Sequence, residues 1–329
     1  MQTATRPLSQ DAPSPCAASA KGPRSRNAPT DSAFKTVPPA RRAIETPGWM
    51  QATLDDALLG KFLHLVHTVC GISMAPSKRL MLQTRLHRRL QANGLTDFSS
   101  YYALLTSPEG RNGELQAFVD CVVTNETSFF RERPHFDFLD DATLTRLAME
   151  GEPGHLAMWS AACSTGEEAY SMAMVAAAAA ARLPESERWR WSVLATDISI
   201  KVLAEARRAV YQAREFDRVP ASLLSAYVLR ARDGASDAVR IGPDLRKHVS
   251  FGQINLMHER FNPGRVMDVI FCRNVLIYFD TKTQQEIIAR LCRHVRPGGL
   301  FILGHADVLR DTTLPLRLVR NNIYERRKD

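Results

Sequence analysis

Between Trp49 and Val123 the apolar residues recur with the period of an α-helix. Three stretches carry this pattern: LDDALLGKFLHLVHTVCGI, APSKRLMLQTRLHRRLQANGL and DFSSYYALLTS, at residues 54–72, 75–95 and 97–107. Gly, Pro and Ser residues separate them, and the second ends at Asn93-Gly94, two residue types that commonly terminate helices. Residues 49–123 are therefore predicted to form a small all-α domain.

After Gly154 short apolar runs alternate with helical stretches. The runs are HLAMWSAAC, RWSVLATDIS, HVSFGQINL, MDVIFCRNVLIYF and GGLFILGHADV. Strands that alternate with helices predict an α/β fold, in which helices cover both faces of a mostly parallel sheet. Ligands of such sheets bind beyond the carboxyl ends of the strands, and polar residues follow each of these runs. We expect this domain to span residues 124–329.

Two segments depart from the alternation. Residues 211–248 have a helical start and then short strand-like pieces near Asp233-Gly234 and Gly242-Pro243, so we expect a small β-hairpin subdomain inserted into the sheet domain. Residues 1–48 hold eight of the eighteen prolines and few aromatic residues. Because such a segment cannot bury enough apolar surface to offset its ordering entropy, we predict a disordered tail.

Composition points to a reduced, soluble protein. The apolar content of 45% over 329 residues allows a sizeable core. No run reaches the roughly 18 to 20 apolar residues of a membrane span, and the N-terminus lacks a signal peptide's apolar segment. We therefore expect a cytoplasmic protein without membrane insertion. No C-x-x-C pair occurs, which predicts free thiols rather than disulfides or a zinc site at Cys16, Cys70, Cys121, Cys163, Cys272 and Cys292.

The net charge of +8 predicts an acidic partner but does not choose among nucleic acid, a membrane surface and a protein. No acidic residue lies between Asp56 and Asp97. Within this segment Arg85, Arg88 and Arg89 have the i, i+3, i+4 spacing that places side chains on one helix face. This face is either simply solvated or a docking site for an acidic surface.

The stretch TNETSFFRERPHF, residues 124–136, has the character of a binding site. Its short polar side chains are suited to holding backbone groups or a ligand. A solvated loop has no need of the adjacent Phe129 and Phe130. We interpret the polar part as a ligand contact and the phenylalanines as its anchor.

A second candidate loop follows the first apolar run, in SAACSTGEEAYSMAM at residues 160–174. A Ser/Gly turn at the head of a helix is typical of nucleotide loops, because free N–H groups and a missing side chain at Gly166 admit a ligand. Glu167 and Glu168 would repel a diphosphate and attract a cationic nucleoside such as S-adenosylmethionine. Cys163 is interpreted as a small buried thiol rather than a nucleophile.

Polar residues after the next two runs remain open to two interpretations each. Asp197 can accept hydrogen bonds from both ribose hydroxyls, or it can cap a helix that starts near Ile198. Asn255 can donate to and accept from an adenine edge, but its position alone does not decide this. His64 and His67 share a helix face, yet no carboxylate or cysteine accompanies them at a suitable spacing, so no metal site is predicted.

The motifs TNETSFFRE, WSAACSTGEEAYSMA, ATDIS, INL, FCRNVLIYFD and GGLFILGHADVL, in this order, closely resemble the CheR family of chemotaxis receptor glutamate methyltransferases. The resemblance runs from about Leu54 to the C-terminus. It implies an S-adenosylmethionine-dependent, Rossmann-like methyltransferase domain after the all-α domain. The implied reaction methylates glutamate side chains of methyl-accepting chemotaxis receptors and leaves S-adenosylhomocysteine.

The resemblance also implies roles for individual residues. Glu167 would bind the methionyl amino group, and Asp197 the ribose. Arg131 and Tyr278 would act on the substrate carboxylate, although a salt-bridged arginine and a core tyrosine are their structural alternatives. The all-α domain would meet the acidic receptor cytoplasmic domain through Arg85, Arg88 and Arg89. The full set of implied cofactor contacts is Asn125, Thr127, Arg131, Glu167, Asp197, Asn255, Leu256, Arg273 and Asn274.

Two other functions were weighed against this one. A nucleic-acid methyltransferase would need aromatic stacking platforms among its basic residues, and the basic helix has none, so no nucleic-acid partner is expected. A non-catalytic module that senses S-adenosylmethionine would not need Arg131 and Tyr278, which are both present. The methyltransferase interpretation requires no general base, because a glutamate with a pKa of about 4.3 is already ionised at neutral pH.

Overall fold

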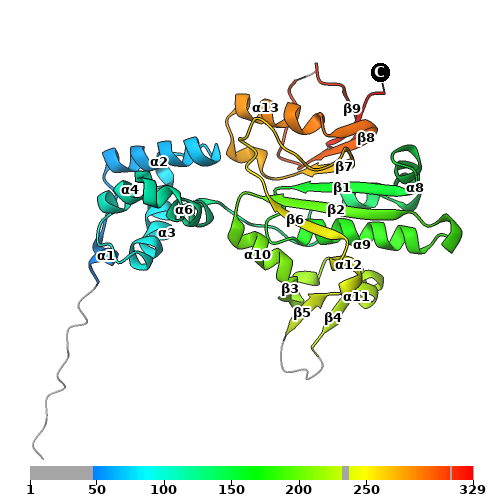
Figure 1. Cartoon of the computed structure of the whole chain (residues 1–329), viewed down its shortest axis with the longest axis horizontal. Helices are drawn as coiled ribbons and strands as arrows, with labels where there is room; N and C mark the ends of the chain where they lie inside the picture. Colours follow the sequence, from blue (N-terminus) through cyan, green and yellow to red (C-terminus); the bar gives the residue numbers. More distant parts are fainter. Residues whose placement is uncertain (1–46, 232–236, 312, 329) are drawn as a thin grey trace, which may run out of the picture. The chain divides into compact units, whose positions relative to one another are not determined.

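The computed structural model describes residues 47–231, 237–311 and 313–328. The tail predicted for residues 1–48 therefore lies almost wholly outside the described residues, as does the Asp233-Gly234 turn. The described chain packs as one compact unit from Pro47 onward. Figure 1 shows its sheet with helices on both sides.

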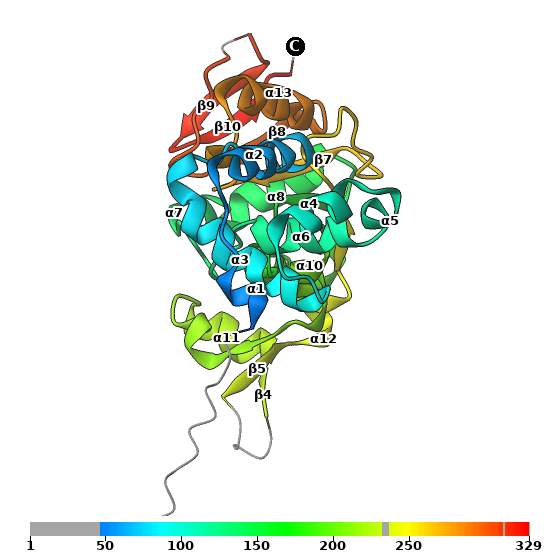
Figure 2. The same cartoon turned by 90° about the vertical axis from the view of Figure 1, so that its left-hand side faces the viewer.

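The three predicted helices of the N-terminal part are present as α2, α3 and α4, and the structure adds α1, α5 and α6. Their bounds are α1 (Gly48–Gln51), α2 (Asp56–Cys70), α3 (Arg79–Ala92), α4 (Phe98–Thr106), α5 (Pro108–Arg111) and α6 (Glu114–Val122). The Asp55 and Asp97 side chains cap α2 and α4 by accepting from the backbone N–H three residues later. Leucines four residues apart on α3 pack into a core with aromatic side chains of α2, α4 and α6. Figure 2 shows these helices gathered side by side.

The sheet confirms the five predicted strands and adds two. They are β1 (His155–Ala161), β2 (Arg190–Asp197), β6 (Val249–Gln253), β7 (Met267–Cys272), β8 (Val295–Leu303), β9 (Leu316–Arg320) and β10 (Ile323–Arg326), in the order β6-β2-β1-β7-β8-β10-β9. The first five in that order pair in parallel, whereas the unpredicted β10 pairs antiparallel with both β8 and β9. The sheet is therefore mostly parallel, as expected.

Both faces of the sheet are covered. Leu156 and Met158 of β1 enter one core with α8 (Asp141–Glu150) and α9 (Glu167–Ala181). Ala157 and Trp159, which alternate with them, enter a second core with α13 (Thr281–Cys292). This alternation follows the two-residue period of a strand, and it explains why the strands are apolar throughout. The sheet domain also contains the short helix α7 (Pro134–Phe138) and helix α10 (Ile200–Arg208).

The inserted segment is larger than the predicted hairpin. Strands β4 (Val228–Arg230) and β5 (Ala238–Ile241) form the expected antiparallel pair, and β3 (Val210–Gln212) adds a third strand next to β5. Helix α11 (Ala221–Tyr227) precedes β4. The strand-like piece expected near Gly242-Pro243 is β5, and Pro243 then begins α12 (Pro243–Arg246), where its missing N–H costs nothing.

Hydrogen bonds tie the end of α2 and helix α6 to the sheet loops. Asn255 Nδ2 donates to the Val69 carbonyl at 2.8 Å, and the Ser73 N–H donates to the Tyr278 carbonyl at 2.7 Å. Gln116 Nε2 on α6 donates to the Ile198 carbonyl at 3.2 Å. The helical part is thus held at the loops that follow β2, β6 and β7.

Gly71 is the tightest point of this junction, and Gly71→Ala is expected to destabilise the protein by about 2–4 kcal/mol. Gly71 ends α2 with a φ of 74°, and an added Cβ would lie 2.2 Å from Met257 Sδ and 2.8 Å from Phe279 Cε1. Urea unfolding of the purified variant would measure the change in the free energy of unfolding.

Two other glycines of the helical part serve as controls, because they separate backbone strain from overlap of the added Cβ with its neighbours. Gly94 has a φ of 65° with open space around it, so Gly94→Ala reports backbone strain alone, about 1 kcal/mol. Gly60 lies inside α2 with nothing near its Cβ position, and Gly60→Ala should stabilise by about 0.5–1 kcal/mol. Equal effects of the Gly71 and Gly94 substitutions would mean that the junction is not tightly packed.

Candidate functional site

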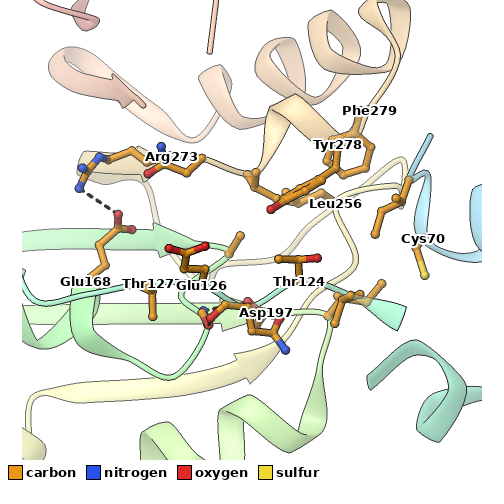
Figure 3. Close-up of a pocket in the computed structure, with 18 of the residues that line it drawn as sticks. Cys70, Thr124, Glu126, Thr127, Glu168, Asp197, Leu256, Arg273, Tyr278 and Phe279 are labelled. Atoms are coloured by element: carbon orange, nitrogen blue, oxygen red, sulfur yellow. Dashed lines mark hydrogen bonds and ion pairs between the residues drawn. The ribbon is translucent and has the colours of Figure 1, made fainter. Parts of the chain in front are cut away.

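A cavity lies beyond the carboxyl ends of β1, β2, β6 and β7 (Figure 3). Its walls come from segment 124–131, from the loops after these strands and from the end of α2. In Figure 3 Asp197 and Tyr278 lie on opposite sides of it. The predicted residues that line it are Asn125, Thr127, Arg131, Asp197, Asn255, Leu256, Arg273, Asn274 and Tyr278.

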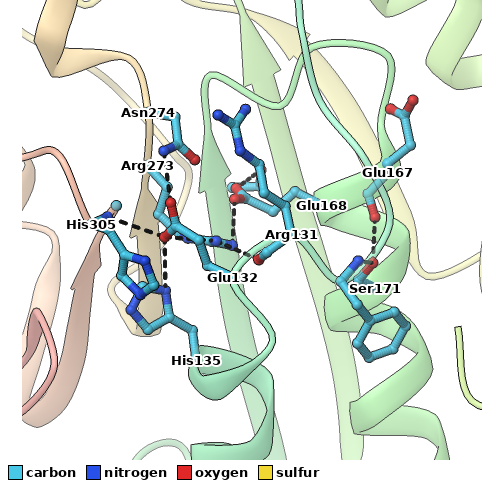
Figure 4. Close-up of polar contacts among 12 residues, drawn as sticks. Arg131, Glu132, His135, Glu167, Glu168, Ser171, Arg273, Asn274 and His305 are labelled. Carbon is cyan, nitrogen blue, oxygen red and sulfur yellow. Dashed lines mark hydrogen bonds and ion pairs between the residues drawn. The ribbon is translucent and has the colours of Figure 1, made fainter. Parts of the chain in front are cut away.

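Glu167 is the exception among the predicted cofactor contacts. It is absent from the cavity lining, and its carboxylate accepts from Thr165 Oγ1 at 2.7 Å, directed away from Arg131 in Figure 4. Its neighbour Glu168 lines the cavity instead and accepts from Ser160 Oγ at 2.6 Å. Consecutive residues of a helix point about 100° apart, so only one of the two can face the cavity, and spacing alone did not decide which.

The loop between β1 and α9 uses its N–H groups within the protein. The N–H groups of Ala162 and Cys163 both donate to the Thr196 carbonyl, at 2.8 and 2.9 Å. The expectation that Gly166 admits a ligand is not met. A Cβ at Gly166, whose φ is 97°, would lie 2.9 Å from Ala206 Cβ, so this glycine allows the close approach of α10.

Asp197 is placed to accept from a ligand. Its carboxylate already accepts from the N–H groups of Ser164 and Ser199, at 2.9 and 3.0 Å, and burial raises its pKa. A carboxylate has about four lone-pair positions, so two remain on a group that lines the cavity. The alternative helix-cap role belongs to Ser199, whose Oγ accepts from the Val202 N–H at the start of α10.

The amide of Asn255 serves the fold. Nδ2 donates to the Val69 carbonyl, and Oδ1 accepts from the Met257 N–H at 2.9 Å. Each group uses one hydrogen bond and keeps a second N–H or a second lone pair, so the expected contact between this amide and an adenine edge stays a prediction. Beside it the lining is apolar and combines Ile198, Ile254 and Leu256 with residues of the helical part that sequence reasoning missed, Cys70 and Ile72.

Arg273 is buried on the inner side of the site, where its two terminal nitrogens are hydrogen-bonded and its Nε has no partner. Only 1% of its side chain is exposed, and its Cζ lies 5.5 and 5.3 Å from the ring centroids of Phe136 and Phe271. Its two terminal nitrogens donate to Glu168 Oε2 and Glu132 Oε2, each at 3.1 Å (Figure 4). Nη2 also donates to the Arg131 carbonyl at 2.5 Å. Arg273 thus joins the end of β7 to segment 124–131.

Arg131 is less constrained than Arg273. It is partly exposed, and Nη1 donates to the Glu126 carbonyl at 2.8 Å. No carboxylate pairs with it among the ion pairs of the described residues, so its salt-bridged alternative is not observed. Tyr278 is also partly exposed and lies in the short 3₁₀ turn 276–278, rather than in the core.

Phe129 and Phe130 anchor the polar segment, as predicted. Both are buried in the core between the sheet and α9, and Phe129 stacks on Phe216 with ring centroids 4.2 Å apart. Phe130 has a φ of 51°, an unfavourable value for a side chain of this size. The packing of the two rings holds the chain in this conformation.

The predicted basic docking face is largely occupied by helix α6. Arg85 Nη1 donates to the carbonyls of Val122 and Val123 at 2.5 and 3.1 Å, which completes the C-terminus of α6. Arg89 forms a two-point ion pair with Glu114, at 2.8 and 2.6 Å. Only Arg88 of the three is exposed. The expectation of a shared docking face is therefore corrected for Arg85 and Arg89.

One group of possible metal ligands escaped sequence reasoning because its members are far apart in the chain. The ligand atoms of Glu132, His135 and His305 lie within 4.8 Å of one another. However, the Glu132 carboxylate already accepts from Arg273, whose guanidinium supplies positive charge at this group.

His67, one of the two histidines considered as metal ligands in the sequence, lies near a carboxylate: its Nε2 is 3.6 Å from Asp280 Oδ2. Among the described residues, no helix has the length and apolarity to cross a membrane.

Comparison with known proteins gives consistent results. A family model described as "CheR methyltransferase, SAM binding domain" matches residues 125–324, and one described as "CheR methyltransferase, all-alpha domain" matches residues 57–123. The "Chemotaxis protein methyltransferase" of Escherichia coli (strain K12) is 38% identical, over 84% of this chain and 93% of that protein. Relatives with the same name in Salmonella typhimurium and Borreliella burgdorferi are each 34% identical, covering 89% and 77% of this chain and 98% and 88% of their own lengths.

His135 predicts a pH dependence of stability. Its Nε2–H donates to the Asn321 carbonyl at 2.9 Å, and burial, with the charge of Arg273, lowers its pKa to about 4. An unfolded histidine binds a proton at about pH 6.5, so the folded state loses stability as the pH falls from 6.5 towards 4, by up to about 3 kcal/mol from this residue. In His135→Gln, which retains a donor for Asn321, urea unfolding should show a smaller loss over this range. The same loss in both proteins would contradict the burial of a neutral His135.

Proposed function

The chain belongs to the CheR methyltransferase family, and from this premise we propose that it methylates glutamate side chains of methyl-accepting chemotaxis receptors. The products are a glutamate γ-methyl ester and S-adenosylhomocysteine. The observation that carries the proposal is the cavity at the strand ends, whose lining combines the buried carboxylate of Asp197, apolar side chains and Arg131, which has no carboxylate partner among the described residues.

The cavity residues suit S-adenosylmethionine, which supplies the methyl group on a positively charged sulfur. Asp197 has free acceptor positions for the ribose hydroxyls, and Ile198, Ile254 and Leu256 offer an apolar surface to the adenine. We assign the methionyl amino group to Glu168, in place of Glu167, because Glu168 faces the cavity. Asn125 and Thr127 complete the polar wall, while Arg273 and Asn274 support it from behind.

The protein's contribution to catalysis is alignment rather than proton transfer. A substrate glutamate is ionised at neutral pH, so no residue has to act as a base. We assign Arg131 and Tyr278 to the substrate carboxylate, because both line the cavity with donors that are not committed to a buried partner. Positioning a nucleophile in this way can lower a barrier by roughly 7–11 kcal/mol, and exclusion of water favours the neutralisation of opposite charges.

The receptor partner is expected to be acidic. The net charge of +8 and the exposed Arg88 of α3 favour approach to a surface rich in carboxylates. Because Arg85 and Arg89 hold α6, we restrict the proposed docking contact on this helix to Arg88. The substrate in this proposal is the receptor's cytoplasmic domain, so the enzyme would work in the cytoplasm and not on nucleic acid.

The deciding test uses S-adenosylmethionine labelled in its methyl group, incubated with the purified protein and receptor-containing membranes. A carboxyl methyl ester releases methanol in mild alkali, so we expect volatile label from a receptor-sized band. Membranes that lack receptors serve as the control. Alkali-stable label, or label in nucleic acid, would contradict the proposed substrate.

For Asp197→Ala we expect cofactor binding to weaken at least tenfold, because the acceptor assigned to the ribose hydroxyls is removed. The substitution also frees two backbone N–H groups. Ser199→Ala is therefore the matched control: it removes the cap of α10, at about 0.5–2 kcal/mol, and leaves the Asp197 carboxylate in place. Calorimetric titration with S-adenosylhomocysteine would compare the three proteins. Equal affinity in Asp197→Ala and the wild type would remove the ribose assignment.

A further inference from the structure

We infer that Glu132 is a positioning residue for the methyl transfer, which holds Arg131 and the loops after β7 and β8 in one arrangement. This inference rests on the proposed function, since it concerns the placement of Arg131 at the reacting carboxylate. Glu132 follows Arg131 directly in the chain but does not line the cavity. It acts, in this view, through its neighbours.

The carboxylate of Glu132 receives donors from two separate loops (Figure 4). Oε1 accepts from Asn274 Nδ2 at 2.8 Å. Oε2 accepts from Arg273 Nη2 at 3.1 Å and from the His305 N–H at 3.2 Å. Arg273 and Asn274 follow β7, whereas His305 follows β8. One side chain therefore ties both loops to the segment that carries Arg131.

Arg273 connects the Glu132 carboxylate to Arg131 itself. The nitrogen that donates to Glu132 also donates to the Arg131 carbonyl, so the carboxylate fixes the guanidinium and the guanidinium fixes the Arg131 backbone. Because only 1% of the Arg273 side chain is exposed and two phenylalanine rings pack near its guanidinium, it cannot replace Glu132 with solvent. Loss of the carboxylate charge would leave a buried cation with one carboxylate partner, Glu168.

His135 donates no hydrogen bond to the Glu132 carboxylate. Its Nδ1 lies 3.5 Å from Glu132 Oε2 and has no hydrogen-bond partner, because the proton resides on Nε2 and is donated to Asn321. The imidazole is fully buried and presents a lone pair to the carboxylate, so it does not compete as a donor. The hydrogen bonds to the Glu132 carboxylate therefore come from Arg273, Asn274 and the His305 N–H.

Backbone conformation gives an independent reason for such a clamp. Glu132 and Asn274 have φ values of 55° and 58°, and Phe130, two residues before Glu132, has 51°. Residues in this region persist only where surrounding contacts hold them. The hydrogen bond between the Glu132 and Asn274 side chains joins two of these unfavourable positions directly.

The test compares Glu132→Gln with Asp137→Asn in the labelled-methanol assay. Glutamine has the same shape but no charge, and its amide would face the donors of Arg273 or Asn274. Asp137 is the matched control, because it is an exposed carboxylate of the next turn that pairs with Arg133. For Glu132→Gln we expect kcat to fall at least 30-fold at saturating cofactor, with the dissociation constant for S-adenosylhomocysteine changed less than fivefold. Asp137→Asn should keep kcat within twofold of the wild type.

A second variant distinguishes a loss of positioning from a loss of folding. Glu132→Asp keeps the charge but withdraws the carboxylate by one methylene, so its kcat should lie between those of the wild type and Glu132→Gln. A kcat of Glu132→Gln within threefold of the control would overturn the inference. A parallel loss of kcat, cofactor affinity and Tm in both variants would also overturn it, since that pattern marks a purely structural residue. If the wild type itself forms no methyl ester, the proposed function fails first, and the inference falls with it.

Discussion

The site depends on one buried cation. The Arg273 guanidinium packs near two phenylalanine rings and pairs with two carboxylates. Through the Arg131 carbonyl it joins strand β7 to a segment more than a hundred residues earlier in the chain. A buried charge is tolerated only when it is paired, and removal of one partner typically costs about 3–5 kcal/mol. The positions of Glu132, Glu168 and the polar segment 124–131 are consequently linked.

The cavity is completed by the helical part of the chain. Cys70 and Ile72, at the end of α2, line it beside residues that follow β2 and β6. The Asn255 amide donates to the Val69 carbonyl and so holds this wall in place. A receptor that displaced α2 would therefore also alter the cofactor's surroundings. This gives the two parts of the chain a physical connection as well as a covalent one.

Unfavourable backbone conformations gather at the same place. Apart from Asn274, the non-glycine residues with positive φ near the cavity are Phe130, Glu132, Ala162 and Ser164. Each is held by a specific contact. Phe130 is held by its core packing and by its N–H to Ser171, and Ala162 by its N–H to the Thr196 carbonyl. Ser164 is held by its N–H to Asp197, and Glu132 by the donors described above. The fold maintains a strained arrangement that a local sequence preference would not select, as is common at functional sites.

The sequence by itself determined the elements and the chemistry they could bring. Hydrophobic period alone identified the helices and the five parallel strands, because a buried strand and an amphipathic helix impose different spacings on the same apolar residues. Nine of the ten residues that the sequence or the family resemblance assigned to catalysis and cofactor binding line the cavity. Those that follow strands do so because the carboxyl ends of parallel strands meet at one edge of the sheet. The sequence did not predict the weakly patterned strands β9 and β10 at one end of the sheet, nor β3, the third strand of the insertion.

Only the tertiary structure decided which of these side chains are free to act. Arg85 and Arg89 satisfy helix α6, the Asn255 amide satisfies α2, and Glu168 rather than Glu167 faces the cavity. The reason is that a polar group's role depends on its hydrogen-bond partners, and these come from residues distant in the chain whose approach local spacing does not encode. Glu132 and His135 become significant for the same reason, because their partners Asn274, His305 and Asn321 are brought to them by the sheet.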